Sequence, residues 1–279
     1  MINSTQLDGV ALVVGSGSGI GRETAFSLAE AGARVVVFAD MNIKTAQASS
    51  QESEKYASNR DYRTAVFEMN VEDETSVQAM VDFVIHHYGR LDYAVNAAGV
   101  DNGVHAPIAE TDLDNFDRVM CINTRGNLVC ARAQVAAMLK QEPKTWTSRN
   151  GTRDIGRGVI VNIASANSYV GLPSKGSYTI SKHAYMAITK MASVDHCSEG
   201  IRVNAVCPTW VRTPLLDEEL KKNPEVQGMM ISAVVPIKRA AQCEEVSDTI
   251  AYLCSPAASY INGTGLLIDA GVTTTVRLF

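Results

Sequence analysis

The sequence predicts an α/β fold, in which a doubly wound parallel sheet carries helices on both faces. Short segments rich in Val, Ile and Leu alternate with helical patterns along most of the 279 residues. These apolar segments are continuous, without alternating polar positions, which is typical of strands buried on both faces. A glycine-rich loop directly follows the first segment, and doubly wound sheets bind ligands at such strand–helix junctions.

About seven strands and the helices between them account for this pattern. We expect strands at Val10–Val14, Arg34–Ala39, Tyr62–Phe67, Leu91–Val95, Val159–Ile163, Arg202–Val206 and Leu266–Ile268. We expect helices at residues 19–31, 42–59, 73–88, 112–140, 176–199 and 243–254. Strand–helix alternation of this kind implies a parallel sheet with helices on both sides. No repeat or linker interrupts it, so we predict one domain over residues 1–279.

The composition argues against several kinds of partner. The formal net charge is −5 and there is no basic stripe, so we expect no nucleic acid. No apolar run reaches the ~18 residues that span a bilayer, and the first residues lack a signal-peptide pattern. We therefore expect a cytoplasmic protein with no membrane contact. The six cysteines contain no Cys-x-x-Cys and the five histidines show no ligand spacing, so we expect no metal.

The glycine-rich loop reads Gly15-Ser16-Gly17-Ser18-Gly19-Ile20-Gly21, and a helix follows it. Glycines allow a tight turn and let a pyrophosphate approach the backbone amides at the helix N-terminus. Glycine is common in any turn, but the strand–loop–helix context makes this a dinucleotide-binding signal. The sequence therefore predicts a nucleotide cofactor at this loop.

Asp40 ends the second strand, about twenty residues after the loop. A carboxylate there accepts hydrogen bonds from the adenine-ribose hydroxyls and repels a 2′-phosphate. No Lys or Arg stands at 16–18 or at 41, and Arg22 is the nearby cation in the sequence. We therefore expect NAD rather than NADP. Asp40 can also serve as the N-cap of the next helix, and the two roles are compatible.

Small residues follow the fourth strand as Asn96-Ala97-Ala98-Gly99, which would let the chain pass closely against a cofactor. Further on, Asn123 lies among apolar neighbours in the long helix over 112–140. A buried Asn needs hydrogen-bond partners and usually has a structural role. Asn123 therefore either belongs to a site or bridges backbone groups.

Tyr178 and Lys182 are four residues apart on a predicted helix, so they lie on one face. A phenol titrates near pH 10, and a nearby cation stabilises the phenolate and lowers its pKa. Ser165 follows an apolar strand at the same edge of the sheet and can meet the start of this helix. Taken alone, Tyr-x-x-x-Lys is equally consistent with two exposed side chains that share a face by chance.

Together these motifs resemble the short-chain dehydrogenase/reductase family, and the resemblance extends from Val10 to Gly271. The motifs that carry it are Gly15-x-x-x-Gly19-Ile20-Gly21, Asn96-Ala97-Ala98-Gly99, Asn123, Ser165, Tyr178-x-x-x-Lys182 and Pro208-Thr209-Trp210-Val211-Arg212-Thr213. The resemblance implies a Rossmann-like sheet and a redox enzyme acting on CH–OH donors. Tyr178 would be the general acid and base, and Lys182 would lower its pKa and bind the nicotinamide ribose. Ser165 would polarise the substrate oxygen, and Asn123 would hold a water that relays the proton.

The resemblance also implies the cofactor contacts. They are Gly15, Ser18, Gly19, Ile20, Gly21, Asp40, Asn70, Val71, Asn96, Ala97, Ala98, Gly99, Tyr178, Lys182, Pro208, Val211 and Thr213. Asn70 stands where the family usually has Asp, so its amide oxygen would accept from the adenine amine without a charge. Ser165, Tyr178 and Trp210 would contact the substrate.

Substrate choice is expected in a lid over about 212–240. Its apolar residues are Leu215, Leu216, Met229, Met230, Ile231 and Val234, and Tyr169, Leu172 and Pro173 could extend the same wall. Such residues accept irregular apolar shapes. We therefore expect a bulky, largely apolar alcohol or ketone of secondary metabolism, such as a terpenoid, polyketide or steroid-like ring. The alternative is an amphipathic helix that only packs on the core.

Residues 142–157 form a polar insertion between a helix and a strand. Such a connection lies at the amino edge of the sheet, opposite the ligand crevice, so we expect a surface role or a subunit contact. The helices over 112–140 and 176–199 resemble those that build the family's homodimer, which is often doubled into a homotetramer.

Two other function classes remain open from the sequence. An enzyme of this fold could catalyse a non-redox step, such as isomerisation, dehydration or cyclisation, with the nucleotide bound. A non-enzymatic nucleotide sensor or scaffold is the third class, and it predicts decay of the catalytic residues. Ser165, Tyr178 and Lys182 are all present, which favours hydride transfer.

Overall fold

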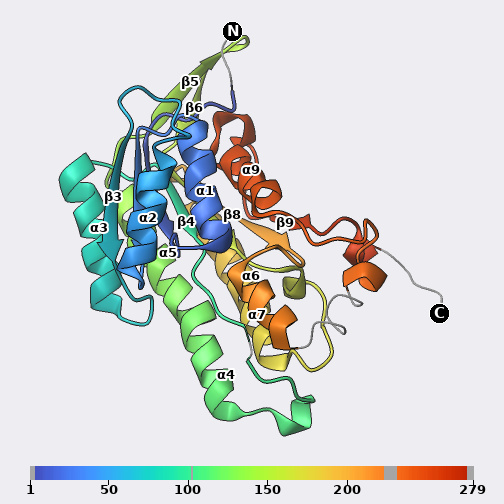
Figure 1. Ribbon diagram of the computed structural model, residues 1–279. Coiled ribbons are helices and arrows are strands. Elements are labelled where there is room, and N and C mark those ends of the chain that lie inside the picture. Colours follow the sequence, from blue (N-terminus) through green and yellow to red (C-terminus); the bar gives the residue numbers. More distant parts are fainter. Residues whose placement is uncertain (1–3, 102, 223–230, 275–279) are drawn as a thin grey trace.

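A seven-stranded parallel sheet forms the centre of the molecule in the computed structural model (Figure 1). The structure describes residues 4–101, 103–222 and 231–274. The strand order is β3-β2-β1-β4-β7-β8-β9, and the predicted doubly wound sheet is confirmed. Its strands are β1 (Val10–Val14), β2 (Val35–Asp40), β3 (Arg63–Glu68), β4 (Tyr93–Asn96), β7 (Gly158–Ile163), β8 (Ile201–Pro208) and β9 (Gly265–Ile268).

Helices cover both faces of this sheet. They are α1 (Gly19–Glu30), α2 (Ile43–Ser53), α3 (Glu74–Tyr88), α4 (Leu113–Met120), α5 (Asn127–Met138), α6 (Gly176–His196), α7 (Pro214–Lys222) and α9 (Cys243–Cys254). One face packs against α1, α2 and α9, and the other against α3 and α5. Within the described ranges, none of the helices combines the length and apolar character that a bilayer crossing requires.

The continuous apolar strands are explained by these two cores. In β1, Ala11 and Val13 point into the core shared with α1 and α9, whereas Val10, Leu12 and Val14 point into the core shared with α3 and α5. All five residues are at most 1% exposed. Because successive side chains of a strand face opposite sides, a strand covered on both faces needs apolar residues at every position.

The helix predicted over 112–140 is interrupted. It forms α4 and α5, with a π-helical turn at Cys121–Gly126 between them. Gly126 packs so closely on Val71 that an added Cβ would lie 2.9 Å from the Val71 Cβ. π-turns inside α-helices often mark functional sites. Here the turn contains Asn123.

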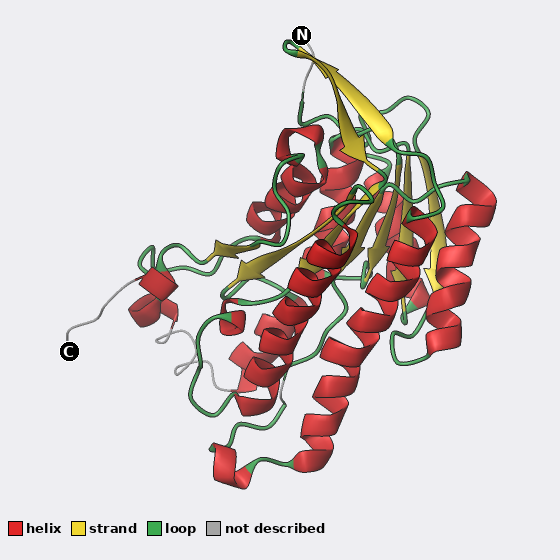
Figure 2. Cartoon of the chain, turned by 180° about the vertical axis from the view of Figure 1, so that it is seen from behind, coloured by secondary structure: helices red, strands yellow, loops and turns green. Residues whose placement is uncertain are grey.

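The polar insertion at 142–157 forms an antiparallel hairpin that the sequence did not predict as strands. It consists of β5 (Lys144–Ser148) and β6 (Gly151–Gly156). Lys144 anchors it by donating to the Asp8 carbonyl at 2.7 Å, and Arg153 donates to the Pro256 carbonyl at 2.9 Å. The hairpin precedes β7 and projects from the end of the molecule opposite α4 and α7 (Figure 1). Figure 2 shows it extending beyond the sheet.

Candidate active site

A cavity of about 690 Å³ opens at the carboxyl ends of the strands. The loops after β1, β2, β3, β4, β7 and β8 surround it, together with the start of α6. Of the predicted site residues, those that line it are Gly15, Ser18, Gly19, Ile20, Gly21, Asp40, Asn70, Val71, Ala97, Ala98, Gly99, Ser165, Tyr178, Lys182, Pro208, Trp210, Val211 and Thr213. Most of the residues singled out from the sequence therefore meet in one cavity.

Two glycines of the loop, Gly15 and Gly21, have no room for a side chain. Gly15 adopts φ +83°, and an added Cβ would lie 2.7 Å from the Ala98 nitrogen. An added Cβ on Gly21 would lie 2.0 Å from the Gly15 carbonyl oxygen. The loop therefore packs directly on the backbone after β4, with the N-terminus of α1 behind it. Such a cradle fits the pyrophosphate of a dinucleotide.

We expect Gly21→Ala to weaken dinucleotide binding at least tenfold, because the methyl group displaces the Gly15 carbonyl and reshapes the loop. Tryptophan fluorescence during NADH titration measures the change. Gly171→Ala is the matched control, since an added Cβ there has no atom within 4 Å. Equal affinity in wild type and Gly21→Ala would contradict this account of the loop.

Asp40 lines the cavity at the end of β2, and its carboxylate also orders the surrounding backbone. It accepts from the Gly17 amide at 2.8 Å and from the Asn42 amide at 2.9 Å. The N-cap of α2 is Asn42, so Asp40 does not serve as that cap. Arg22 pairs with Glu52 at 2.6 Å. An acidic side chain therefore stands at this end of the cavity, and Arg22 has a carboxylate partner of its own.

Asn70 and Val71, which follow β3, line the same cavity. The Asn70 side-chain oxygen accepts from the Glu72 amide at 3.0 Å, so it already orders the turn after β3. Each amide oxygen has a second lone pair, and the side-chain NH₂ group is a donor. Asn70 can therefore shape this end of the cavity without a negative charge.

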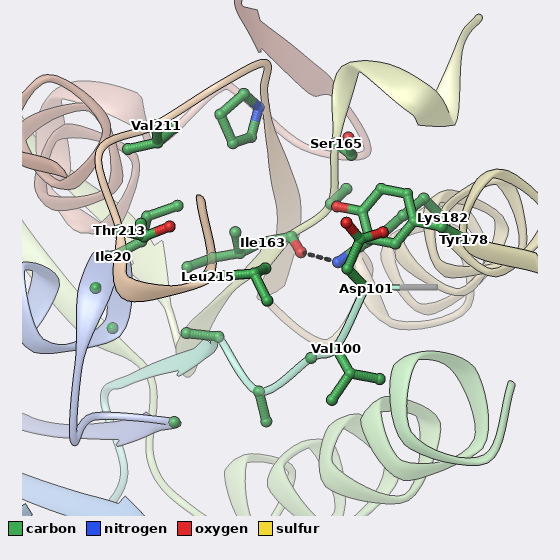
Figure 3. A pocket seen from close by; sticks show the side chains of 18 of the residues that line it. Ile20, Val100, Asp101, Ile163, Ser165, Tyr178, Lys182, Val211, Thr213 and Leu215 are labelled. Atoms are coloured by element: carbon green, nitrogen blue, oxygen red, sulfur yellow. Dashed lines mark hydrogen bonds between the residues drawn. The ribbon is translucent and has the colours of Figure 1, made fainter. Parts of the chain in front are cut away.

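Ser165, Tyr178 and Lys182 lie together on one side of the cavity (Figure 3). The Lys182 Nζ lies 5.6 Å from the centre of the Tyr178 ring and donates to the Ile163 carbonyl at 3.0 Å. Ser165 is the N-cap of a short turn, and its Oγ accepts from the Asn167 amide at 3.1 Å. That contact uses an Oγ lone pair, so the Ser165 hydroxyl proton can be donated to a substrate oxygen.

Lys182 is buried, with 5% of its surface exposed. Burial lowers the pKa of its ammonium to about 8, while the nearby Cys207 thiol and Asp101 carboxylate act in the opposite direction. The cation therefore lies in a poorly solvated place, where its charge acts strongly on neighbouring groups. The Tyr178 ring, whose centre lies 5.6 Å from the ammonium nitrogen, is such a neighbour.

Asn96 and Asn123 do not line the cavity, so the structure gives no support to direct cofactor contact by Asn96. Asn96 is fully buried and donates to Gln134 and Asn162, both at 3.0 Å, joining β4, β7 and α5. Buried amides need such partners, which turns this side chain inward.

Asn123 is also fully buried and hydrogen-bonds to the backbone of the segment after β4. Its Oδ1 accepts from the Val100 amide at 2.8 Å, and its Nδ2 donates to the Val100 carbonyl at 2.8 Å and the Ser181 Oγ at 3.1 Å. These contacts fit a positioning role that ties the Gly99–Val100 segment to α6. They correspond to the structural alternative left open by the sequence.

Asp101 and Lys175 line the cavity but were not singled out in the sequence. They form an ion pair, and the Lys175 Nζ lies 6.0 Å from the centre of the Tyr178 ring. Lys175 stands three residues before Tyr178, so helical spacing offered a signal for it. Nothing in the sequence pattern indicated that Asp101 would reach the same place.

Apolar residues complete the substrate side of the cavity. Those from the predicted lid are Leu215, Leu216 and Val234, and Trp210, Val170 and Leu172 add to them. Ile231 packs instead in a small core with Leu216. Tyr169 lies away from the cavity and donates to the Gly265 carbonyl at 3.0 Å. Met229 and Met230 fall outside the described residues.

No metal site was predicted, and the part of the chain that the structure describes holds no cluster of three or more His, Cys, Asp or Glu suited to a metal ion. The cavity instead combines a dinucleotide cradle at one end with a hydroxyl, a phenol and a buried ammonium at the other. This arrangement defines a nicotinamide-dependent oxidoreductase site.

Comparisons with known proteins agree with that class. A family model described as enoyl-(acyl carrier protein) reductase matches residues 14–273. The chain is 39% identical over 272 residues to the short-chain dehydrogenase anuF of Penicillium roqueforti, covering 98% of each. The chain therefore belongs to the short-chain dehydrogenase/reductase family, and it is an oxidoreductase of that family.

Solved structures share the whole fold. Levodione reductase superposes with a TM-score of 0.86 at 28% identity, covering 99% of this chain and 100% of that one. A gluconate 5-dehydrogenase from Burkholderia cenocepacia, solved with NADP and tartrate, gives a TM-score of 0.83 at 29% identity, with 98% of each chain covered. Nicotinamide cofactors are thus common to the family, and the choice between NAD and NADP depends on this chain's own residues.

Proposed function

We propose that this protein is an NAD(H)-dependent enzyme that interconverts a secondary alcohol and a ketone on a bulky, largely apolar skeleton. The observation that carries the proposal is the single cavity that joins the Gly15–Gly21 cradle to Ser165, Tyr178 and Lys182. Trp210, Leu215 and Leu216 supply an apolar wall for the skeleton, in keeping with a terpenoid, polyketide or steroid-like substrate.

The chemistry follows from the positions of three side chains. When bound, the nicotinamide supplies or accepts the hydride. In the reductive direction Ser165 donates a hydrogen bond to the substrate carbonyl oxygen, and Tyr178 donates the proton that completes the alcohol. In oxidation Tyr178 takes that proton back. The Lys182 ammonium stabilises the tyrosinate, because it is a poorly solvated cation close to the ring.

NAD is the proposed cofactor because Asp40 ends β2 beside the expected adenine ribose. We expect Asp40→Asn to raise NADP(H) affinity roughly ten- to hundredfold, since the variant removes a negative charge but keeps an acceptor oxygen. Fluorescence titrations with NADH and NADPH measure the ratio. Glu68→Gln is the matched control, because Glu68 of β3 stands next to Asp40 in the β2–β3 strand register but lies outside the cavity lining. A wild type that prefers NADPH would refute the role given to Asp40.

A direct test of the function combines binding with turnover. Wild type is titrated with NAD(H) and NADP(H) and then assayed by absorbance of the reduced nicotinamide on a panel of apolar secondary alcohols and ketones. Hydride transfer on bulky members supports the proposal. Tight nucleotide binding without hydride transfer on any member would favour the non-redox alternative, and activity confined to small polyols would refute the apolar substrate class.

We also propose that the enzyme works in the cytosol as a homodimer or homotetramer. Ile180, Met191 and Val194 recur on one face of α6 and are 41%, 56% and 71% exposed. Leu113 of α4 and Leu128 of α5 are also exposed. A second copy that covers these side chains would remove them from water.

A further inference from the structure

The wall of the cavity opposite the lid carries a buried ion pair. Lys175 is 8% exposed, and the Asp101 side chain is 14% exposed. Ion pairs in such places contribute little to folding, because the desolvation of both charges offsets their attraction. Both residues line the cavity next to Tyr178. A polar function toward a ligand accounts for a pair that stability alone does not explain.

Two loops distant in sequence hold this pair in place. Ala106 and Lys175 form an isolated parallel β-bridge, and the Ala106 amide donates to the Ser174 carbonyl at 3.3 Å. Ser174 adopts φ +63°, in the left-handed region that favours glycine. Lys175 is then the N-cap residue of α6. These contacts fix the backbone at Lys175, three residues before Tyr178.

Figure 3 shows Asp101 on the same side of the cavity as Ser165, Tyr178 and Lys182, while Val211, Thr213 and Leu215 lie on the other side. A substrate whose reacting oxygen meets Ser165 and Tyr178 therefore has the ion pair beside it. The rest of its skeleton contacts Leu215 and Trp210. The ion pair adds two charged groups to a lining that also holds the polar residues Arg118, Asn167 and Thr209.

We propose that Lys175 and Asp101 bind a second, neutral hydroxyl group of the substrate, separate from the oxygen that reacts. This rests on the proposed function, whose substrate class it narrows to hydroxylated ketones and diols. A hydroxyl both accepts and donates, so it can accept from the Lys175 ammonium and donate to the Asp101 carboxylate. A carboxylate at the same place gains little, because its repulsion by Asp101 offsets its attraction to Lys175 in a pair that has no net charge.

The test compares ketones that differ in one group. 1-Tetralone, its ring-hydroxylated isomers and a ring-carboxylated analogue are titrated calorimetrically into the NADH complex of Tyr178→Phe, which lacks the proton donor and turns over slowly. We expect at least one hydroxylated isomer to bind roughly ten- to hundredfold tighter than 1-tetralone, which corresponds to a hydrogen bond with a charged group. The carboxylated analogue is expected to bind no tighter than 1-tetralone.

Lys175→Met in the same background should abolish that preference. Lys190→Met is the matched control, an exposed lysine of the same helix outside the cavity lining, and it should keep the preference. If Lys175→Met does not fold because the buried Asp101 carboxylate loses its lysine partner, Lys175→Met/Asp101→Leu removes both charges together and has the same expected result.

The contrary results are distinct. No binding by any isomer, equal binding of 1-tetralone and every isomer, or a preference kept by Lys175→Met would overturn the hydroxyl site. An equal loss of affinity for all ketones in Lys175→Met would show a structural role instead. If hydroxylated isomers bind as expected but wild type transfers no hydride to any of them, the hydroxyl site stands and the proposed reaction fails.

Discussion

Tyr178→Phe is expected to lower kcat by about 10²–10⁴-fold, because it removes the group that exchanges the proton with the substrate oxygen. NADH affinity should stay within a few-fold of wild type, since the ring remains and the Gly15–Gly21 cradle is untouched. Stopped-flow or steady-state absorbance gives kcat, and fluorescence titration gives the affinity. Losing turnover while keeping the cofactor would separate proton transfer from binding.

Tyr260→Phe is the matched control for this variant, because Tyr260 is fully exposed and lies outside the cavity lining. It should match wild type in both measurements. A Tyr178→Phe variant with near-wild-type kcat would mean that another group delivers the proton, and the assignment of Tyr178 would have to be abandoned.

Lys182→Met is expected to lower turnover and to raise the free energy of unfolding. Turnover should fall roughly 10²–10³-fold, because a preorganised cation no longer stabilises the tyrosinate. The free energy of unfolding at pH 7 should rise by about 2 kcal/mol. Burying the charged Lys182, which lowers its pKa from 10.5 to about 8, costs the wild type about 3 kcal/mol of stability. Lys182→Met removes this cost but also loses the hydrogen bond to the Ile163 carbonyl, which destabilises the variant by about 1 kcal/mol.

The stability difference between Lys182→Met and the wild type depends on pH. Between pH 8 and 10.5 the folded wild type loses the Lys182 proton, whereas the unfolded chain keeps it. The unfolded state then binds more protons, so the wild type gains stability as pH rises through this window. The advantage of Lys182→Met should therefore shrink toward pH 10.5. Urea unfolding at several pH values, with Lys190→Met as control, measures it, and an advantage that grows with pH would contradict the assigned burial penalty.

The sequence predicted the sheet well because each strand is apolar on both faces, as in β1, and this pattern needs no knowledge of the neighbours. It also located Gly15–Gly21, Ser165, Tyr178 and Lys182, whose spacing depends on local structure. The strand and helix ends moved by a few residues, and the helix predicted over 42–59 ends at Ser53. Local patterns leave such ends poorly determined.

What the sequence missed depends on contacts between distant segments. The π-helical turn within the helix over 112–140 lies where Gly126 closely approaches Val71. The inward turn of Asn96 depends on Gln134 and Asn162, and the Asp101–Lys175 pair depends on two loops meeting. The β5–β6 hairpin was missed because its strands are polar, so they lack the apolar signal that identified the others.

The β5–β6 hairpin is a suitable site for attaching a label or a surface. Its turn at Arg149 and Asn150 is exposed and lies at the end of the molecule opposite α7, which borders the cavity (Figure 1). A fluorophore or an affinity peptide grafted there stays distant from the catalytic groups. Tethering the enzyme to a surface through this turn would leave the mouth of the cavity facing the solution, so immobilised and free enzyme can be compared under the same assay.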